Sequence, residues 1–183
     1  MAITRLGGAT AITGTIPQGN IANASLGAVT TLPAGVGGKV LQVVRNYVPN
    51  TSLIESTSTS FTASGIQASI TPSASGNLIL VDYICGLSQA VDSGTGDAIK
   101  ARMYQKIGTG SMAAMSGSNE FQIAYVYDLG NEAFSPMVFN GSYTSTNTDT
   151  LIFEPYFLSQ SGGNVRFTYS KTSYSLTLTE IAQ

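Results

Sequence analysis

Short segments in which apolar and polar side chains alternate recur from Lys39 to the end of the chain, with turn residues between them. In the stretch 99–103, for example, Ile, Ala and Met alternate with Lys and Arg. A period of two is typical of a β-strand that has one face in a core and the other in water. No stretch has the 3.6-residue period of an amphipathic helix longer than a turn or two. The pattern therefore predicts an all-β domain.

About eight to ten strands are expected, and two packed antiparallel sheets are the natural way to bury one face of each strand. The predicted fold is a jelly-roll-like antiparallel β-sandwich or a simpler sandwich, because alternation does not fix the order of the strands. The segments that carry the pattern are 39–48, 66–71, 77–85, 99–107, 121–127, 136–140, 150–158, 165–170 and 174–179.

Some segments predict further details of the sandwich. Residues 77–85 are apolar at nearly every position, which predicts a central strand covered on both faces. Pro155 cannot donate to a β-ladder and therefore predicts an edge or a bulge. Gly141 is expected to close the short strand 136–140. The segment 108–118, which holds two Met among Gly and Ser residues, predicts a long exposed loop or a contact patch.

Residues 1–38 predict an extended N-terminal arm, followed by one sandwich domain over residues 39–183. The segment is too apolar for a typical disordered tail, and Arg5 is its only charged side chain. Ordering its backbone would cost about 1–2 kcal/mol per residue, which its small side chains cannot offset alone. We therefore expect the arm to lie on a neighbouring subunit through its larger apolar residues, namely Ile12, Ile16, Ile21, Leu26 and Leu32.

Charge and hydropathy exclude several classes of function. Ten per cent of the residues are charged, against about 25% in an average soluble protein. The net charge of −2 offers no basic face for a nucleic acid. A sparsely charged surface indicates a protein inside an assembly, the alternative being a monomer kept soluble by hydroxyl and amide groups. No apolar run is long enough for a bilayer span or a signal peptide, so we expect no membrane partner and synthesis in the cytoplasm.

Catalysis has few candidate residues in this chain. The absence of His removes the usual general base, the commonest metal ligand and every Ser-His-Asp or Cys-His arrangement. Two carboxylate pairs, Asp92 with Asp97 and Asp128 with Glu132, could serve as acid and nucleophile or, in the first pair, hold Ca²⁺ weakly. Since Asp and Gly also build turns, we expect no enzymatic activity, no cofactor and no metal site. Cys85 lies in an apolar run and is predicted to be a buried, inert thiol.

One basic cluster is expected on a single strand face, where Lys100, Arg102 and Lys106 accompany Tyr104. As a functional site it would contact an acidic surface of a partner protein. The alternative is a solvated face on which the Tyr ring packs among the aliphatic stems of Lys and Arg. The nine Tyr residues could also form a sugar- or protein-binding face, although the absence of Trp disfavours a carbohydrate platform.

Three segments resemble structural proteins on the virions of tailed bacteriophages: GKVLQVV at 38–44, SITPS at 69–73 and TEIA at 179–182. The arm pattern ITGTIPxxNIANxSLGxVTxLPAGVGG is similar to the same family. In that family such domains occur as tail-fibre heads and head-surface proteins, typically as trimeric β-sandwiches. The resemblance implies a non-enzymatic homotrimer on the outer surface of a phage particle, made in the host cytoplasm. Its partners would be the major capsid protein or other virion proteins.

Among these virion roles, we favour a head decoration (cement) protein. A fibre needs a coiled coil or a long repetitive stalk, and no such segment is present in the sequence. The 38-residue arm could reach about 125 Å when extended, so we expect it to clamp the capsid lattice. The alternatives are a short tail fibre or tail-tip receptor-binding protein and, least favoured, a soluble carbohydrate-active or lectin-like domain.

Overall fold

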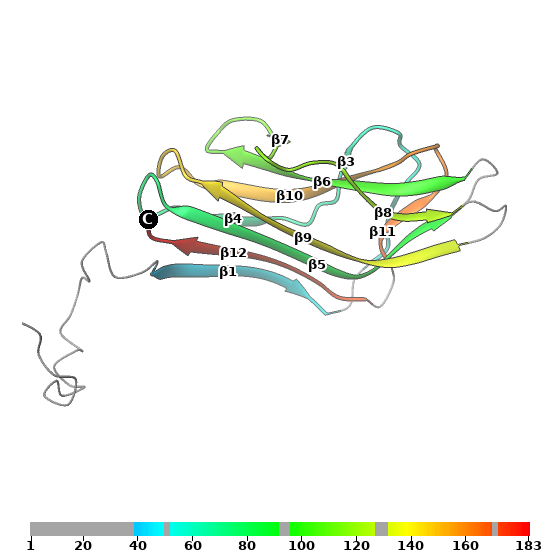
Figure 1. The fold of residues 1–183 in the computed structure, drawn as a ribbon, viewed down its shortest axis with the longest axis horizontal. Helices are drawn as coiled ribbons and strands as arrows, with labels where there is room; N and C mark the ends of the chain where they lie inside the picture. Colours follow the sequence, from blue (N-terminus) through cyan, green and yellow to red (C-terminus); the bar gives the residue numbers. More distant parts are fainter. Residues whose placement is uncertain (1–38, 50–51, 92–95, 127–131, 170–171) are drawn as a thin grey trace, which may run out of the picture. The chain divides into compact units, whose positions relative to one another are not determined.

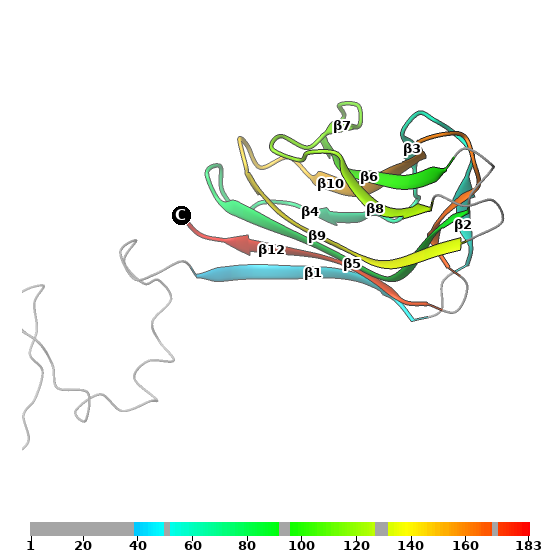
Figure 2. The same ribbon diagram turned by 45° about the vertical axis from the view of Figure 1, so that its right-hand side comes forward.

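The computed structural model describes residues 39–49, 52–91, 96–126, 132–169 and 172–183. The predicted arm, 1–38, lies outside the described residues. The described part of the chain holds twelve β-strands in two antiparallel sheets that pack face to face (Figures 1 and 2). This arrangement confirms the predicted antiparallel β-sandwich. Among these residues there is no helix long and apolar enough to cross a membrane.

The strands divide evenly between the two sheets. Sheet A contains β1 (Val40–Val48), β2 (Ile54–Ser56), β5 (Leu78–Val91), β9 (Glu132–Thr144), β11 (Val165–Thr168) and β12 (Tyr174–Ile181). Sheet B contains β3 (Thr62–Ala63), β4 (Ala68–Ile70), β6 (Asp97–Ile107), β7 (Ala113–Ala114), β8 (Phe121–Val126) and β10 (Leu151–Ser159). The sequence pattern does not indicate β2, β3 and β7, because two or three residues are too few to show a period.

The strand order is that of a jelly roll. The main path of sheet A is β1-β12-β5-β9, and that of sheet B is β4-β10-β6-β8. Most connections between these strands cross from one sheet to the other, which closes a single core between the layers. β11 and β2 continue sheet A beside the second half of β5.

Inward-facing side chains of both sheets form this core. Ile79, Val81 and Tyr83 of β5 are fully buried. Phe167 of β11 joins the two layers, because its ring stacks on Phe157 of β10 and on Tyr83, with centroid distances of 4.9 Å and 5.7 Å. Burial of each large apolar side chain contributes about 1.5–3 kcal/mol to folding.

The outer face of β5 is not covered as its apolar sequence predicts. Leu78, Leu80 and Asp82 are only partly buried, and Ile84 is 51% exposed. The prediction of a strand covered on both faces is therefore wrong for the described part of one chain. β5 is central in its sheet, but its outward side chains form part of the domain surface.

Pro155 lies in an interior strand, so the prediction of an edge is wrong, but the pairing on one side of this strand shifts register at Pro155. β10 pairs with β6 on one side, where Pro155 stands opposite Met103, and with β4 and β3 on the other. Pairing with β4 ends at Phe153 and pairing with β3 begins at Tyr156. The Pro155 carbonyl accepts a hydrogen bond from the backbone N–H of Ser64 at 3.3 Å on this side. Since the nitrogen points the same way, the missing donor faces the gap between two strands and breaks no ladder.

Gly141 does not close a short strand, because β9 runs through it to Thr144. A Cβ atom on Gly141 would lie 2.7 Å from Cζ of Phe139 and 2.8 Å from Cε of Met115. Glycine therefore lets these two side chains pack against the backbone. Met115 is 2% exposed and belongs to the core, whereas most other residues of the segment 108–118 are exposed, as predicted.

Candidate interaction surface

Exposed apolar side chains gather on sheet A. Seven of the eight large apolar residues that are exposed in the described part of the chain lie on β1, β5 or β9; they are Val40, Leu41, Val43, Tyr47, Ile84, Phe134 and Val138. Exposed apolar residues scattered singly need no explanation, but a continuous group on one sheet face marks an interaction surface.

Three neighbouring rows of outward side chains cross β1, β12, β5 and β9, and we call them the sheet A face. The two flanking rows are apolar on β1 and β5, whereas the middle row is charged there. On β12 every row has a Ser or Thr. In strand order the rows are Val43, Thr179, Leu80 and Ser142; Arg45, Thr177, Asp82 and Asn140; and Tyr47, Ser175, Ile84 and Val138.

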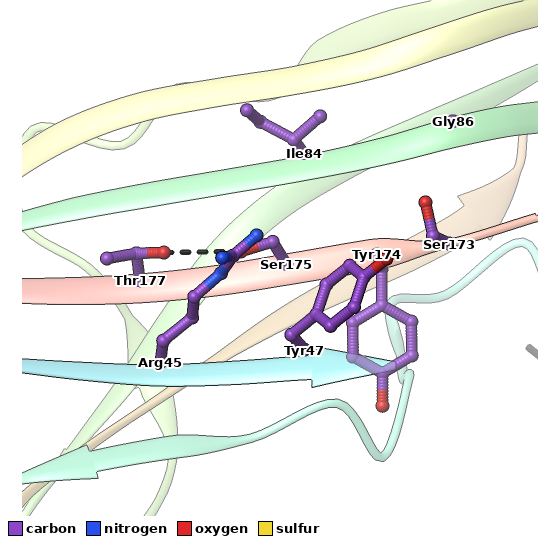
Figure 3. Close-up of a pocket in the computed structure, with 8 residues that line it drawn as sticks. All are labelled: Arg45, Tyr47, Ile84, Gly86, Ser173, Tyr174, Ser175 and Thr177. Atoms are coloured by element: carbon purple, nitrogen blue, oxygen red, sulfur yellow. Dashed lines mark hydrogen bonds between the residues drawn. The ribbon is translucent and has the colours of Figure 1, made fainter. Parts of the chain in front are cut away.

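A hollow of about 410 Å³ lies over β12 on this face. Its floor is made by small residues, including Gly86, Ser173 and Ser175, and Tyr47 and Ile84 stand beside it. Figure 3 shows the β1 side chains reaching over β12, with Ile84 on the far side on β5. The hollow therefore forms where short side chains on β12 lie between longer side chains on β1 and β5. A protruding side chain of a partner protein could fit into it.

The middle row holds two charges of opposite sign. Arg45 donates from Nε to Ser175 Oγ at 2.8 Å, and its guanidinium carbon lies 4.7 Å from the centroid of the Tyr47 ring. Asp82 accepts a hydrogen bond from Asn140 Nδ2 at 2.6 Å. Neither charge forms an ion pair with any residue that the structure describes. Both remain available to a partner.

The predicted basic cluster is assembled on the outer face of sheet B. Lys100, Arg102, Tyr104 and Lys106 share the outward side of β6, and along the strand they alternate with the buried Ala101 and Met103 and with the half-buried Gln105. Lys100 Nζ lies 2.8 Å from Oε1 of Glu120. Arg102 donates from Nε to the carbonyl of residue 118 at 2.9 Å, whereas Lys106 makes no polar contact with the described residues. Two of the three cations are therefore partly satisfied within the domain.

Tyr104 belongs to an aromatic group on the same face. Its ring stacks on Tyr156 with a centroid distance of 4.0 Å and lies 6.0 Å from the Phe61 ring. Burial, followed by the nearby charge of Glu154 and by Tyr104, raises the pKa of Tyr156. Tyr104 therefore packs against aromatic rings on this face.

The two acidic candidates that the structure describes, Asp97 and Glu132, contact other residues of the domain. Asp97 is fully buried, and its carboxylate accepts hydrogen bonds from Ser159 Oγ and from the backbone N–H groups of residues 98 and 161. Glu132 lies 3.9 Å from Arg166 at the surface. Asp92 and Asp128 lie outside the described residues, as do the arm positions Ile12, Ile16, Ile21, Leu26 and Leu32. No group of three or more potential metal ligands occurs among the residues that the structure describes.

The sheet A face is the candidate site that the sequence prediction missed. Its signal was present, because residues 77–85 are apolar on both faces and the strand 39–48 has Val and Tyr at outward positions. Alternation alone does not distinguish an outward face buried under another element from one left open for a partner. The structure shows that no described element of the same chain covers it.

Comparisons with known proteins assign no family to this chain. No protein-family model matches the chain, and no characterised protein matches its sequence. Among solved structures, the domain is similar to a chain in the structure of infectious bursal disease virus, Gx strain, with a TM-score of 0.34 and 12% sequence identity. The similarity covers 78% of this chain and 41% of that chain, so this chain spans less than half the length of the viral one.

Proposed function

We propose that this protein is a non-enzymatic structural component of a phage virion and acts as a head decoration (cement) protein. The observation that carries the proposal is the sheet A face, on which exposed Val, Ile and Tyr side chains of β1, β5 and β9 flank a row that holds Arg45 and Asp82. The resemblance of three sequence segments to phage virion proteins supports the proposal that the particle is a phage virion.

Such a face favours association with another protein. Each exposed apolar side chain that leaves water contributes about 25 cal/mol per Å² of buried apolar area. Soluble monomers rarely keep extended apolar patches open, because these promote association. The low fraction of charged residues adds little electrostatic repulsion to oppose contact.

In this proposal the domain assembles as a homotrimer, and residues 1–38 extend to neighbouring subunits or to the major capsid protein. The arm would add buried area across the joints of the lattice and so resist their opening. Neither nucleic acid nor membrane is a partner, which agrees with the net charge of −2.

Copy number in purified particles tests this proposal. A cement protein covers a lattice, so its copy number should be comparable with that of the shell protein, as measured by quantitative mass spectrometry. A copy number limited to a few sets per tail would instead identify a short tail fibre or tail-tip protein. Absence from the particle would reject both virion roles.

Deletion of residues 1–38 tests the role of the arm. The truncated domain should fold, because its core lies within the described residues, but it should no longer join the particle. The matched control is the full chain added to the same particles. Full incorporation of the truncated protein would remove the clamp from the proposal.

A further inference from the structure

Arg45 and Asp82 occupy equivalent places on either side of β12. Both stand in the row centred on Thr177, with Arg45 on β1 and Asp82 on β5. Neighbouring strands lie about 4.8 Å apart, so each charge is one strand from the middle. Neither charge forms an ion pair within the part of the chain that the structure describes.

The flanking rows repeat this layout with apolar side chains. Val43 and Leu80 stand on either side of Thr179 in one row. Tyr47 and Ile84 stand on either side of Ser175 in the other, and both are 51% exposed. In these three rows the outward residues of β12 are small hydroxyl side chains. In each row of the face, a side chain on β1 and a side chain of complementary character on β5 therefore lie at equal distances from β12.

We propose that two copies of this chain pack through their sheet A faces, about a two-fold axis that runs along β12. Such an axis keeps each row in place and exchanges its two sides. Arg45 of one copy then faces Asp82 of the other, and the contact occurs twice. In the flanking rows, Tyr47 faces Ile84 and Val43 faces Leu80 of the second copy.

The dimensions of the face suit this packing. Sheets that pack face to face lie about 10 Å apart, a gap that an Arg and an Asp side chain can span together. The axis keeps the strands of the two copies parallel, within the range of aligned sheet packing. The hollow over Ser173 and Ser175 leaves room for the Tyr47 and Ile84 side chains of the second copy.

Charge favours a second copy over the arm as the occupant of this face. Residues 1–38 contain no Asp or Glu, and Arg5 is their only charged side chain. An arm lying on the face would leave Arg45 without an acidic partner. A second copy provides both signs of charge at the required spacing, and such complementarity fixes the register of an interface.

This contact goes beyond the proposed function and uses the same sheet A face that supports it, but the pairing of two copies does not require a virion role. A trimer formed through a different surface would be joined by this contact to a second trimer. The copy number in purified particles could reject the virion role while two copies still pair in solution. The mass in solution could equally reject the pairing while the virion role holds. The two experiments therefore test the two proposals separately.

The test is the mass of the full-length protein in solution, measured by sedimentation equilibrium over a range of concentrations. The variants are Arg45→Asp, Asp82→Arg and the double exchange, with Lys106→Glu as a matched charge reversal on the outer face of sheet B. Each single variant places like charges opposite each other twice, so we expect its dissociation constant to rise by about tenfold to a hundredfold. The double exchange should restore association, and Lys106→Glu should leave it unchanged. Circular dichroism checks that every variant is folded.

Three results would overturn the pairing. The first is a wild-type protein whose mass in solution corresponds to an odd number of copies of the chain. The second is a mass that neither single variant changes. The third is association that the single variants weaken and the double exchange does not restore, which would assign the face to residues 1–38 or to a different protein.

Discussion

Ser73 donates two hydrogen bonds to the same carboxylate oxygen of Glu180, from its backbone N–H at 2.7 Å and from its hydroxyl at 2.8 Å. The two residues are 107 positions apart in the chain. Asn77 Nδ2 donates to this oxygen at 2.6 Å, and Gln42 Nε2 donates to the other oxygen. Gln42, Ser73 and Glu180 come from three segments that lie far apart in the chain, 38–44, 69–73 and 179–182. Those segments therefore meet at the buried Glu180 carboxylate, in a partly buried network that ties β1 and β12 to the turn before β5.

Glu180→Gln should destabilise the domain. Glu180 is fully buried, and the amide nitrogen of Gln would face donors instead of accepting from them. We expect the free energy of unfolding in urea to fall by about 2–3 kcal/mol. The control is Glu55→Gln, because the Glu55 side chain is 45% exposed and a surface ion pair contributes less than about 1 kcal/mol. Equal effects of the two substitutions would contradict a structural role of the network.

The same carboxylate should make stability depend on pH. Burial acts to raise the pKa of Glu180, but the hydrogen bonds from Gln42, Asn77 and Ser73 outweigh it and hold the pKa below its usual value. Its contribution is therefore complete above the unfolded pKa of about 4.3 and is lost as the pH falls through the lower folded pKa. The difference in unfolding free energy between wild type and Glu180→Gln should shrink as the pH falls below about 4.3. A difference that stays constant over this range would contradict the assignment.

The sequence predicts the strands and the sandwich well, because a period of two is a local property. The prediction fails at positions whose structure depends on residues far away in the sequence. Pro155 indicates an edge by its chemistry, yet it lies in an interior strand because β3 and β4 leave a gap beside it. Gly141 indicates the end of a strand, yet it is there to admit Phe139 and Met115. Both depend on residues far away in the chain, which no local pattern can reveal.

The candidate site was predictable only in part. The alternation in β6 correctly places Lys100, Arg102, Tyr104 and Lys106 on one face. It could not indicate that Glu120 and Tyr156 already contact two of them. The sheet A face requires the register of four strands, since Arg45 and Asp82 come into one row only through β12.

Gly141→Ala should destabilise the domain modestly. The added Cβ would lie under 3.0 Å from Phe139 and Met115, so both side chains must move. Because the contacted atoms are the ends of side chains, we expect a loss of about 1–2 kcal/mol in urea unfolding. The control is Gly86→Ala, where the nearest atom would be 3.6 Å away and the effect should stay within about 0.5 kcal/mol. A neutral Gly141→Ala variant would show that the core has spare room at this point.

Cys85 should be protected from thiol reagents in the native protein. The residue is fully buried, and its Sγ lies 3.6 Å from the carbonyl oxygen of Leu87 and 3.7 Å from that of Phe167. Burial raises the pKa of the thiol, so less of the reactive thiolate is present at any pH below that value. We expect its reaction with a disulfide reagent to be at least about a hundredfold slower in buffer than in urea.

An exposed thiol on the same domain provides the control for this measurement. Ser111 is exposed between β6 and β7, so Ser111→Cys should react at once with one equivalent of reagent, and Cys85 should follow only on unfolding. If local opening of β9 from β5 exposes Cys85, its rate will be independent of global stability and unaffected by Glu180→Gln. If access requires global unfolding, Glu180→Gln will accelerate the reaction in proportion to its effect on the unfolding equilibrium. We expect the second result, because β5 is held by β12 on one side and β9 on the other. Prompt reaction of Cys85 in the folded wild-type protein would contradict its burial.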